Sequence, residues 1–134
     1  MNRSRILVVD DQPNWREVIT DVLRDAGDYV RGADSVASAW KLLDKEDFDI
    51  AILDVRLVDS NPYDIQGIEL LEQMKEKLGD RFPIVVMTGY SFEGMEEILR
   101  TDYGVRDFIN KGSAALQNLD AFRNRIYEIV LESV

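Results

Sequence analysis

Residues Ile6-Leu7-Val8-Val9-Asp10-Asp11 form a short apolar run that ends in two acids. Similar apolar runs occupy residues 50–53 and 84–87, and they are followed by Asp54 and Thr88. A strand that is buried on both faces of a parallel sheet has this nearly continuous apolar character. The three runs therefore predict three central strands, each of which leads into a polar residue.

Two less apolar segments complete the predicted sheet. One runs from Tyr29 to Ala33 and contains Arg31 and Gly32, and the other runs from Val105 to Ile109. The first of these has the composition of an edge strand. Because the second and fifth strands are the least apolar, we expect both at the edges. This arrangement fits the flavodoxin-like strand order 2-1-3-4-5.

Helical spacing of apolar residues separates the strands. The positions that follow it are Trp15, Val18, Ile19, Val22 and Leu23; Val36, Ala39, Trp40 and Leu43; Ile68, Leu71, Met74 and Leu78; Met95, Ile98 and Leu99; and Leu116, Leu119, Phe122, Ile126, Ile129 and Val130. Alternating strands and helices indicate a parallel sheet with helices on both faces. We predict a single α/β domain over residues 1–134, a flavodoxin-like (βα)5 fold whose last helix covers about 113–132. Both tryptophans are expected to pack against the sheet.

The composition excludes several classes of chemistry. The 134 residues contain no cysteine and no histidine, so thiolate catalysis and a phosphohistidine on this chain are excluded. The net charge of −10 disfavours direct contact with nucleic acid. No apolar run approaches the length of a membrane span, and residues 2–5 do not resemble a signal peptide. We expect a cytoplasmic protein that uses oxygen ligands.

Polar side chains follow the predicted strands at one edge of the sheet. They are Asp10, Asp11, Asp54, Thr88 and Lys111. Taken singly, each has a structural explanation as a helix cap, a turn residue or a solvent-facing side chain. Taken together, they predict a crevice of three carboxylates beside a hydroxyl and an ammonium. Such a crevice suits Mg²⁺ or Mn²⁺, and a carboxylate beside the cation could attack phosphorus.

The same residues carry a resemblance to a known family. The run 6–11, the strand that ends at Asp54, the step 87–89 and the segment 108–111 look like a bacterial receiver domain of two-component signalling. The match extends over essentially the whole chain. The resemblance implies that Asp54 accepts a phosphoryl group and that Asp10 and Asp11 hold the metal ion. It also implies a metal contact from the backbone carbonyl of Arg56.

The resemblance assigns roles to three further side chains. Thr88 matches a switch hydroxyl, Lys111 a lysine that pairs with the phosphoryl group, and Phe108 a switch aromatic residue. The implied phosphodonor is a histidine kinase, a phosphotransfer protein or a small molecule such as acetyl phosphate. The chain would then catalyse its own phosphorylation and dephosphorylation.

Two features depart from the family pattern. Gly67 arrives thirteen positions after Asp54, so the loop 55–66 looks like it contains an insertion. Either it is a tolerated surface loop or it covers the site and recognises a partner. Gly112 stands where the family usually has proline, and we predict a trans peptide bond between Lys111 and Gly112 because a non-proline cis bond is costly.

Three alternatives to a phosphorylated receiver remain open at this stage. One is a receiver-like interaction module that works without phosphorylation. Another is a Mg²⁺-dependent phosphohydrolase with an aspartate nucleophile, although Arg56 stands where such enzymes usually have a second acid. The third is a flavodoxin-like cofactor binder, which would need a phosphate-binding loop in place of Asp10 and Asp11.

The output surface follows from the movement expected at the switch residues. We expect the Thr88 hydroxyl to lie outside the core and to move toward a phosphoryl group, so that an exposed Phe108 ring rotates inward. This movement would change the face formed by the fourth helix, fifth strand and fifth helix, roughly Phe92 to Tyr127. A downstream protein partner or a second copy of the chain would bind there.

Overall fold

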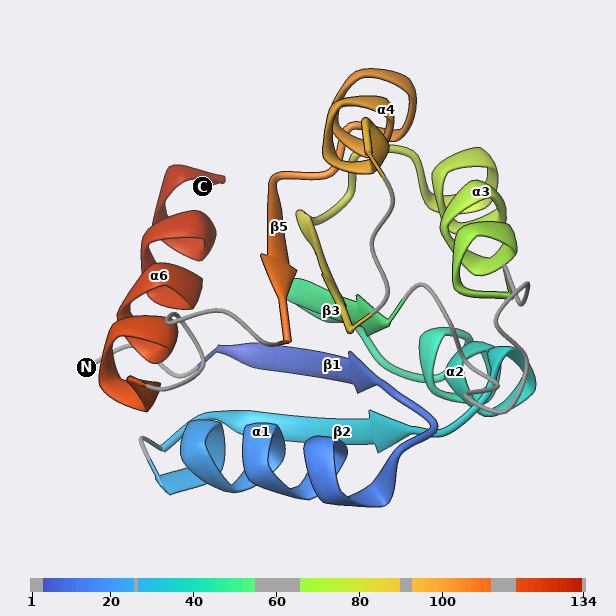
Figure 1. Cartoon of the computed structure of the whole chain (residues 1–134). Coiled ribbons are helices and arrows are strands. Elements are labelled where there is room, and N and C mark those ends of the chain that lie inside the picture. The colour runs from blue at the N-terminus through green and yellow to red at the C-terminus, as the bar shows by residue number, and fades with distance from the viewer. Residues whose placement is uncertain (1–3, 26, 55–65, 90–92, 112–117, 134) are drawn as a thin grey trace.

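The computed structural model describes residues 4–25, 27–54, 66–89, 93–111 and 118–133. It contains a five-stranded sheet in the order β2-β1-β3-β4-β5 (Figure 1). The strands are β1 Arg5–Val9, β2 Tyr29–Ala33, β3 Ile50–Asp54, β4 Ile84–Thr88 and β5 Asp107–Asn110. All adjacent pairs are parallel. The α/β class, the flavodoxin-like strand order and the two edge strands predicted from the sequence are confirmed.

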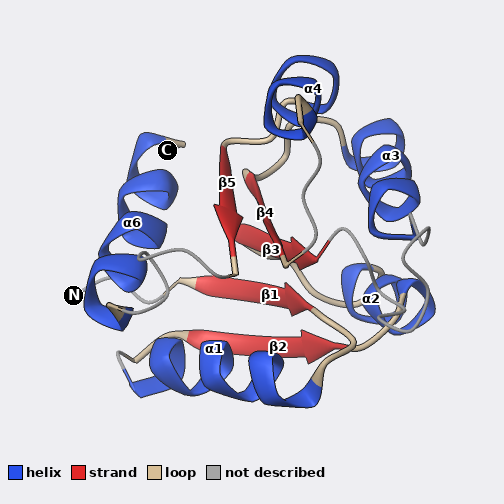
Figure 2. Cartoon of the chain, viewed as in Figure 1, coloured by secondary structure: helices blue, strands red, loops and turns tan. Residues whose placement is uncertain are grey.

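Helices cover both faces of the sheet (Figure 2). They are α1 Pro13–Asp25, α2 Val36–Leu43, α3 Gln66–Leu78, α4 Met95–Tyr103 and α6 Leu119–Glu132. Side chains of α1 and α6 form one core cluster with Ile6 and Val8, whereas those of α2, α3 and α4 form another with Leu7 and Val9. Alternate residues of β1 therefore face opposite layers, as the period of a strand requires.

The last helix begins later than predicted. Asn118 has an extended backbone, and its side chain accepts a hydrogen bond from the Ala121 amide, so that the helix begins at Leu119 instead of about residue 113. Asparagine at this position satisfies an amide that the first turn leaves without a helical partner. The preceding residues 112–117 lie outside the described part of the chain.

The two tryptophans differ in their packing. Trp40 packs against the core as predicted, and its Nε1 donates a hydrogen bond to Gln73 Oε1 at 2.8 Å. Trp15 is only half-buried, and its ring instead faces the Lys111 ammonium at 5.4 Å from the ring centroid. On the same helix Val18 is 44% exposed, so the apolar face of α1 is wider than the stripe that it buries.

No helix within the described ranges is both long enough and apolar enough to cross a lipid bilayer.

Candidate functional site

Four polar residues lie at the carboxyl end of the sheet. Asp10 follows β1, Asp54 ends β3, Thr88 ends β4 and Lys111 follows β5. Their exposed fractions are 1%, 2%, 0% and 7%. Charged groups this deeply buried are costly unless they are paired or bind a cation. The parallel topology thus gathers residues that are far apart in the sequence, as predicted.

Three carboxyl groups form a compact acidic cluster in this crevice. Carboxylate oxygens of Asp10, Asp11 and Asp54 lie within 4.8 Å of one another. Asp10 and Asp54 are buried, and Asp11 is half-buried. Carboxylates this close repel each other, and a positive charge between them relieves the repulsion.

Most polar atoms of Asp10 have a protein partner. Its amide donates to the Ala33 carbonyl at 3.0 Å, and its Oδ1 accepts from the Gln12 amide at 3.0 Å. Its carbonyl oxygen accepts from Arg16 Nη1 at 2.7 Å. The buried Oδ2 accepts no hydrogen bond of good geometry from the described residues, although Lys111 Nζ lies 2.9 Å away. This oxygen is therefore available as a ligand.

The ammonium group of Lys111 lies against the acidic cluster. Its Nζ donates to Asp54 Oδ2 at 2.8 Å and to Gln12 Oε1 at 2.9 Å. Burial lowers the pKa of Lys111, but the contacts with Asp54 and Asp10 outweigh it and hold this pKa above the usual value for lysine. The lysine is thus a permanent cation that offsets part of the negative charge.

The donor set of the cluster fits a hard divalent cation. Three carboxylates supply only oxygen ligands, and Lys111 is the single ammonium that contacts Asp10 and Asp54 among the described residues. Mg²⁺ and Mn²⁺ prefer such oxygen ligands. The buried Oδ2 of Asp10 would gain the cation as a partner in addition to the Lys111 ammonium. Asp10, Asp11 and Asp54 are therefore the residues that could hold it.

Thr88 and Phe108 differ from the expectation that both were exposed. Thr88 is fully buried at the end of β4, where its carbonyl accepts a hydrogen bond from the Lys111 amide at 2.8 Å. Phe108 is half-buried against the core cluster of α2, α3 and α4. Both residues belong to a packed layer because the strands β4 and β5 are covered by helices. Arg56, the loop 55–65, Phe92 and Gly112 lie outside the described residues, so the predictions made for them stay predictions.

Sequence reasoning missed two side chains that contact the cluster. Gln12 holds the Lys111 ammonium, and Arg16 holds the Asp10 carbonyl. Gln12 could have been noticed because it directly follows Asp11 in the same loop. Arg16 gave no such signal, because an arginine on the polar side of an amphipathic helix is usually a solvated residue.

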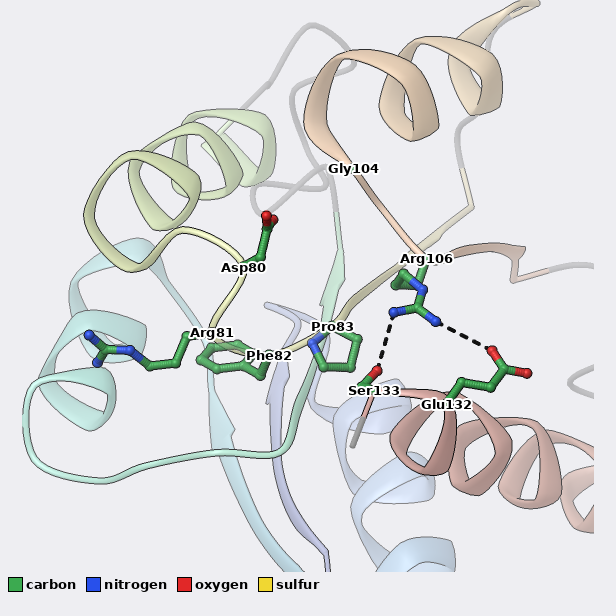
Figure 3. Close-up of a pocket in the computed structure, with 8 residues that line it drawn as sticks. All are labelled: Asp80, Arg81, Phe82, Pro83, Gly104, Arg106, Glu132 and Ser133. Carbon is green, nitrogen blue, oxygen red and sulfur yellow. Dashed lines mark hydrogen bonds and ion pairs between the residues drawn. The ribbon is translucent and has the colours of Figure 1, made fainter.

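A cavity lies at the opposite end of the sheet from the acidic cluster. It has a volume of about 410 Å³ and is lined by residues that include Phe82, Pro83 and Arg106 (Figure 3). Arg106 donates hydrogen bonds to Ser133 Oγ at 3.2 Å and to Glu132 Oε2 at 3.4 Å. These contacts link the start of β5 to the end of α6. None of the polar residues at the carboxyl end of the sheet lines this cavity, and its groups of both signs do not indicate a ligand.

The chain is similar to a known protein family and to several of its members. A family model described as the response regulator receiver domain matches residues 6–123. The regulatory protein VanRc of Enterococcus gallinarum is 31% identical over 108 residues, which cover 81% of this chain and 43% of VanRc. An uncharacterised 14.6 kDa protein of Leptolyngbya boryana is 31% identical over 108 residues, which cover 79% of this chain and 77% of that protein.

Solved structures share the same fold. A CheY-like response regulator receiver domain protein from Methanospirillum hungatei has a TM-score of 0.82 at 24% identity and covers 98% of this chain and 97% of its own. The non-phosphorylated HemR receiver domain from Leptospira biflexa has a TM-score of 0.78 at 26% identity, with coverages of 96% and 94%. By contrast, the chain spans only 43%, 23% and 19% of VanRc, of PilR from Pseudomonas aeruginosa and of AlgB from Pseudomonas putida.

Proposed function

The chain belongs to the response regulator receiver domain family of two-component systems, and on this basis we propose that it is a switch phosphorylated on Asp54 in a Mg²⁺-dependent reaction. The observation that carries the proposal is the acidic cluster itself. Asp54 lies within 4.8 Å of the carboxylates of Asp10 and Asp11, and its Oδ2 contacts Lys111 Nζ at 2.8 Å. This arrangement supports an aspartate nucleophile beside a cation site and a fixed positive charge.

In the proposed reaction an Asp54 carboxylate oxygen forms a bond to phosphorus. The bond between phosphorus and the donor's leaving atom breaks, and the leaving group keeps the electron pair. A bound Mg²⁺ would supply positive charge to the phosphoryl oxygens. Lys111, already beside Asp54, would pair with one of these oxygens, and the Thr88 hydroxyl would donate to another. We assign the metal ligands to Asp10, Asp11, Asp54 and the carbonyl of Arg56.

The phosphodonor is proposed from the chemistry of the chain. The 134 residues contain no histidine, so a phosphohistidine donor has to lie outside them. A histidine kinase, a phosphotransfer protein or acetyl phosphate would meet this requirement. Receiver domains interact with kinases and effector domains, and we propose that this chain does so in the cytoplasm.

The proposed output face consists of α4, β5 and α6, and it is tied together by one carboxylate. Asp107 accepts hydrogen bonds from Arg100 of α4 and from Arg125 of α6, both at 2.9 Å. Its Oδ1 also accepts from the Phe108 amide at 2.9 Å. A movement of the Phe108 backbone would therefore disturb the carboxylate that joins α4 to α6. Amide NMR shifts on this face should change with beryllofluoride, and a silent face would contradict a switch of this kind.

The phosphoacceptor assignment is tested by intact mass after incubation with acetyl phosphate. We expect one added phosphoryl group with Mg²⁺, none after chelation and none in Asp54→Asn. A matched control is Asp34→Asn, because Asp34 also follows a strand but lies outside the acidic cluster. Full labelling of Asp54→Asn would refute the assignment. Failure of the parent chain to be labelled would favour the phosphorylation-independent interaction module.

A further inference from the structure

Arg16 of α1 bridges the edge strand β2 and the end of β1. Its Nη1 donates to the carbonyl oxygen of Asp10 at 2.7 Å. Its Cδ and Cγ lie 3.2 Å and 3.4 Å from the position that a Cβ on Gly32 would occupy. The stem of the arginine therefore lies across Gly32, and its charged end reaches the peptide unit that joins Asp10 to Asp11.

The peptide unit held by Arg16 sets the direction of both acids. The Asp10 amide is already held by Ala33, and the Asp10 Oδ1 by the Gln12 amide. With the carbonyl also held by a charged donor, the loop that carries Asp10 and Asp11 has little freedom to turn. Residues that orient metal ligands in this way affect the affinity for the metal without touching it.

The backbone of β2 gives no reason for a glycine at position 32. Gly32 is not among the described glycines with positive φ, and it pairs with Val8 in the regular parallel register. Glycine within a strand is unfavourable compared with residues that have a side chain. The close approach of Arg16 supplies a reason, because a Cβ would lie 3.2 Å from the arginine Cδ and the arginine stem would have to shift by a few tenths of an ångström.

We propose that Arg16 is a positioning residue for the metal-binding acids and that Gly32 provides the space in which Arg16 reaches the Asp10 carbonyl. The proposal rests on the Mg²⁺ site of the proposed function. It concerns neither a metal ligand nor a catalytic group. Arg16 would act only through the orientation of Asp10 and Asp11.

The test is a double-mutant cycle with Gly32→Val and Arg16→Met. Valine blocks the path of Arg16, and methionine keeps part of the stem but removes the guanidinium. Removing a positive charge near the cluster alters the Mg²⁺ affinity by itself. The effect of Gly32→Val is therefore measured twice, once in the parent chain and once in the Arg16→Met chain. Valine suits an edge strand, so loss of the fold is not expected.

The first readout is the dissociation constant for Mg²⁺, measured by calorimetry. Gly32→Val should weaken binding about tenfold when Arg16 is present, the lower end of the effects seen for groups that orient metal ligands. In the Arg16→Met chain the same substitution should leave the dissociation constant unchanged. The second readout is the Asp11 amide NMR shift of the metal-free protein. Gly32→Val and Arg16→Met should each displace it, and the double variant should resemble Arg16→Met alone.

Equal effects of Gly32→Val in both backgrounds, or no effect in either, would overturn the role of Arg16 while leaving the metal site in place. An unmoved Asp11 amide would overturn it as well, without any metal being added. A parent chain that binds no Mg²⁺ would instead refute the proposed function, and the positioning role would fall with it.

Discussion

Asp107→Asn should loosen the connection between α4, β5 and α6. The carboxylate accepts from Arg100 Nη2 and Arg125 Nε, and its side chain is only 17% exposed. Asparagine has nearly the same shape, so the substitution removes the charge without leaving a cavity. Its amide nitrogen is a donor and would face one of the two guanidinium groups.

The structure sets the size of the expected loss. An exposed ion pair contributes about 0.2–1 kcal/mol, and each arginine here is 40% exposed. Both arginines keep another carboxylate, Glu96 at 2.9 Å for Arg100 and Glu128 at 3.2 Å for Arg125. Two pairs of this kind give a loss of about 0.4–2 kcal/mol in the free energy of unfolding at neutral pH.

The pH dependence of this loss has a definite sign. Burial raises the pKa of Asp107, but hydrogen bonds from Arg125 and the Phe108 amide outweigh it, so the pKa lies below that of a free aspartate. A lowered folded-state pKa stabilises the protein above the unfolded-state value of about 4. This contribution disappears as the pH falls through the folded-state pKa. The gap between the parent and Asp107→Asn should therefore narrow below about pH 4.

Urea unfolding at several pH values measures the difference in free energy of unfolding between the parent and Asp107→Asn. Glu96→Gln is a matched control, because it removes a single (i, i+4) ion pair with Arg100 whose carboxylate is more exposed than that of Asp107. It should lower the free energy of unfolding by only about 0.3–0.5 kcal/mol. Equal stability of Asp107→Asn and the parent at neutral pH would refute the reasoning. A gap that stays constant down to the lowest pH at which the chain folds would show that charge is not its source.

Three further predictions follow from other contacts. Burial and the hydrogen bond to Asp28 raise the pKa of Tyr127 to about 12. Phenolate absorbance should therefore show a titration step near this pH that Tyr127→Phe removes. The contribution of this group to the free energy of unfolding should decline as the pH rises from about 10 to 12. In metal-free protein that carries Trp40→Phe, Lys111→Met should alter the fluorescence of Trp15, because the ammonium lies 5.4 Å from the centroid of that ring. An identical emission spectrum would contradict this contact. Ser35→Ala removes the side-chain cap of α2 and should cost about 1 kcal/mol, seen as a lower thermal midpoint; an unchanged midpoint would mean that the cap is replaced by solvent.

The strands and the main site residues were predictable because they depend on local patterns. An apolar run such as residues 6–9 can only be a doubly buried strand or a short buried helix, and its length and β-branched residues favour the strand. Once the strands are parallel, their carboxyl ends share one edge, and the residues that follow them must meet there. Asp10, Asp54 and Lys111 can therefore be placed together from the sequence alone.

Contacts between side chains from separate elements depended on the tertiary structure. The contact between Lys111 and Gln12 joins residues 99 positions apart, and the position of Trp15 beside that lysine follows from how α1 lies on the sheet. Hydrophobic periodicity identifies the face of a helix that is buried, but not the partner that each polar side chain on its margin will reach. Gly32 shows the difference most clearly. Its position in an edge strand was readable from the sequence, whereas the arginine stem that lies 3.2 Å from the place of its missing Cβ came into contact only through packing.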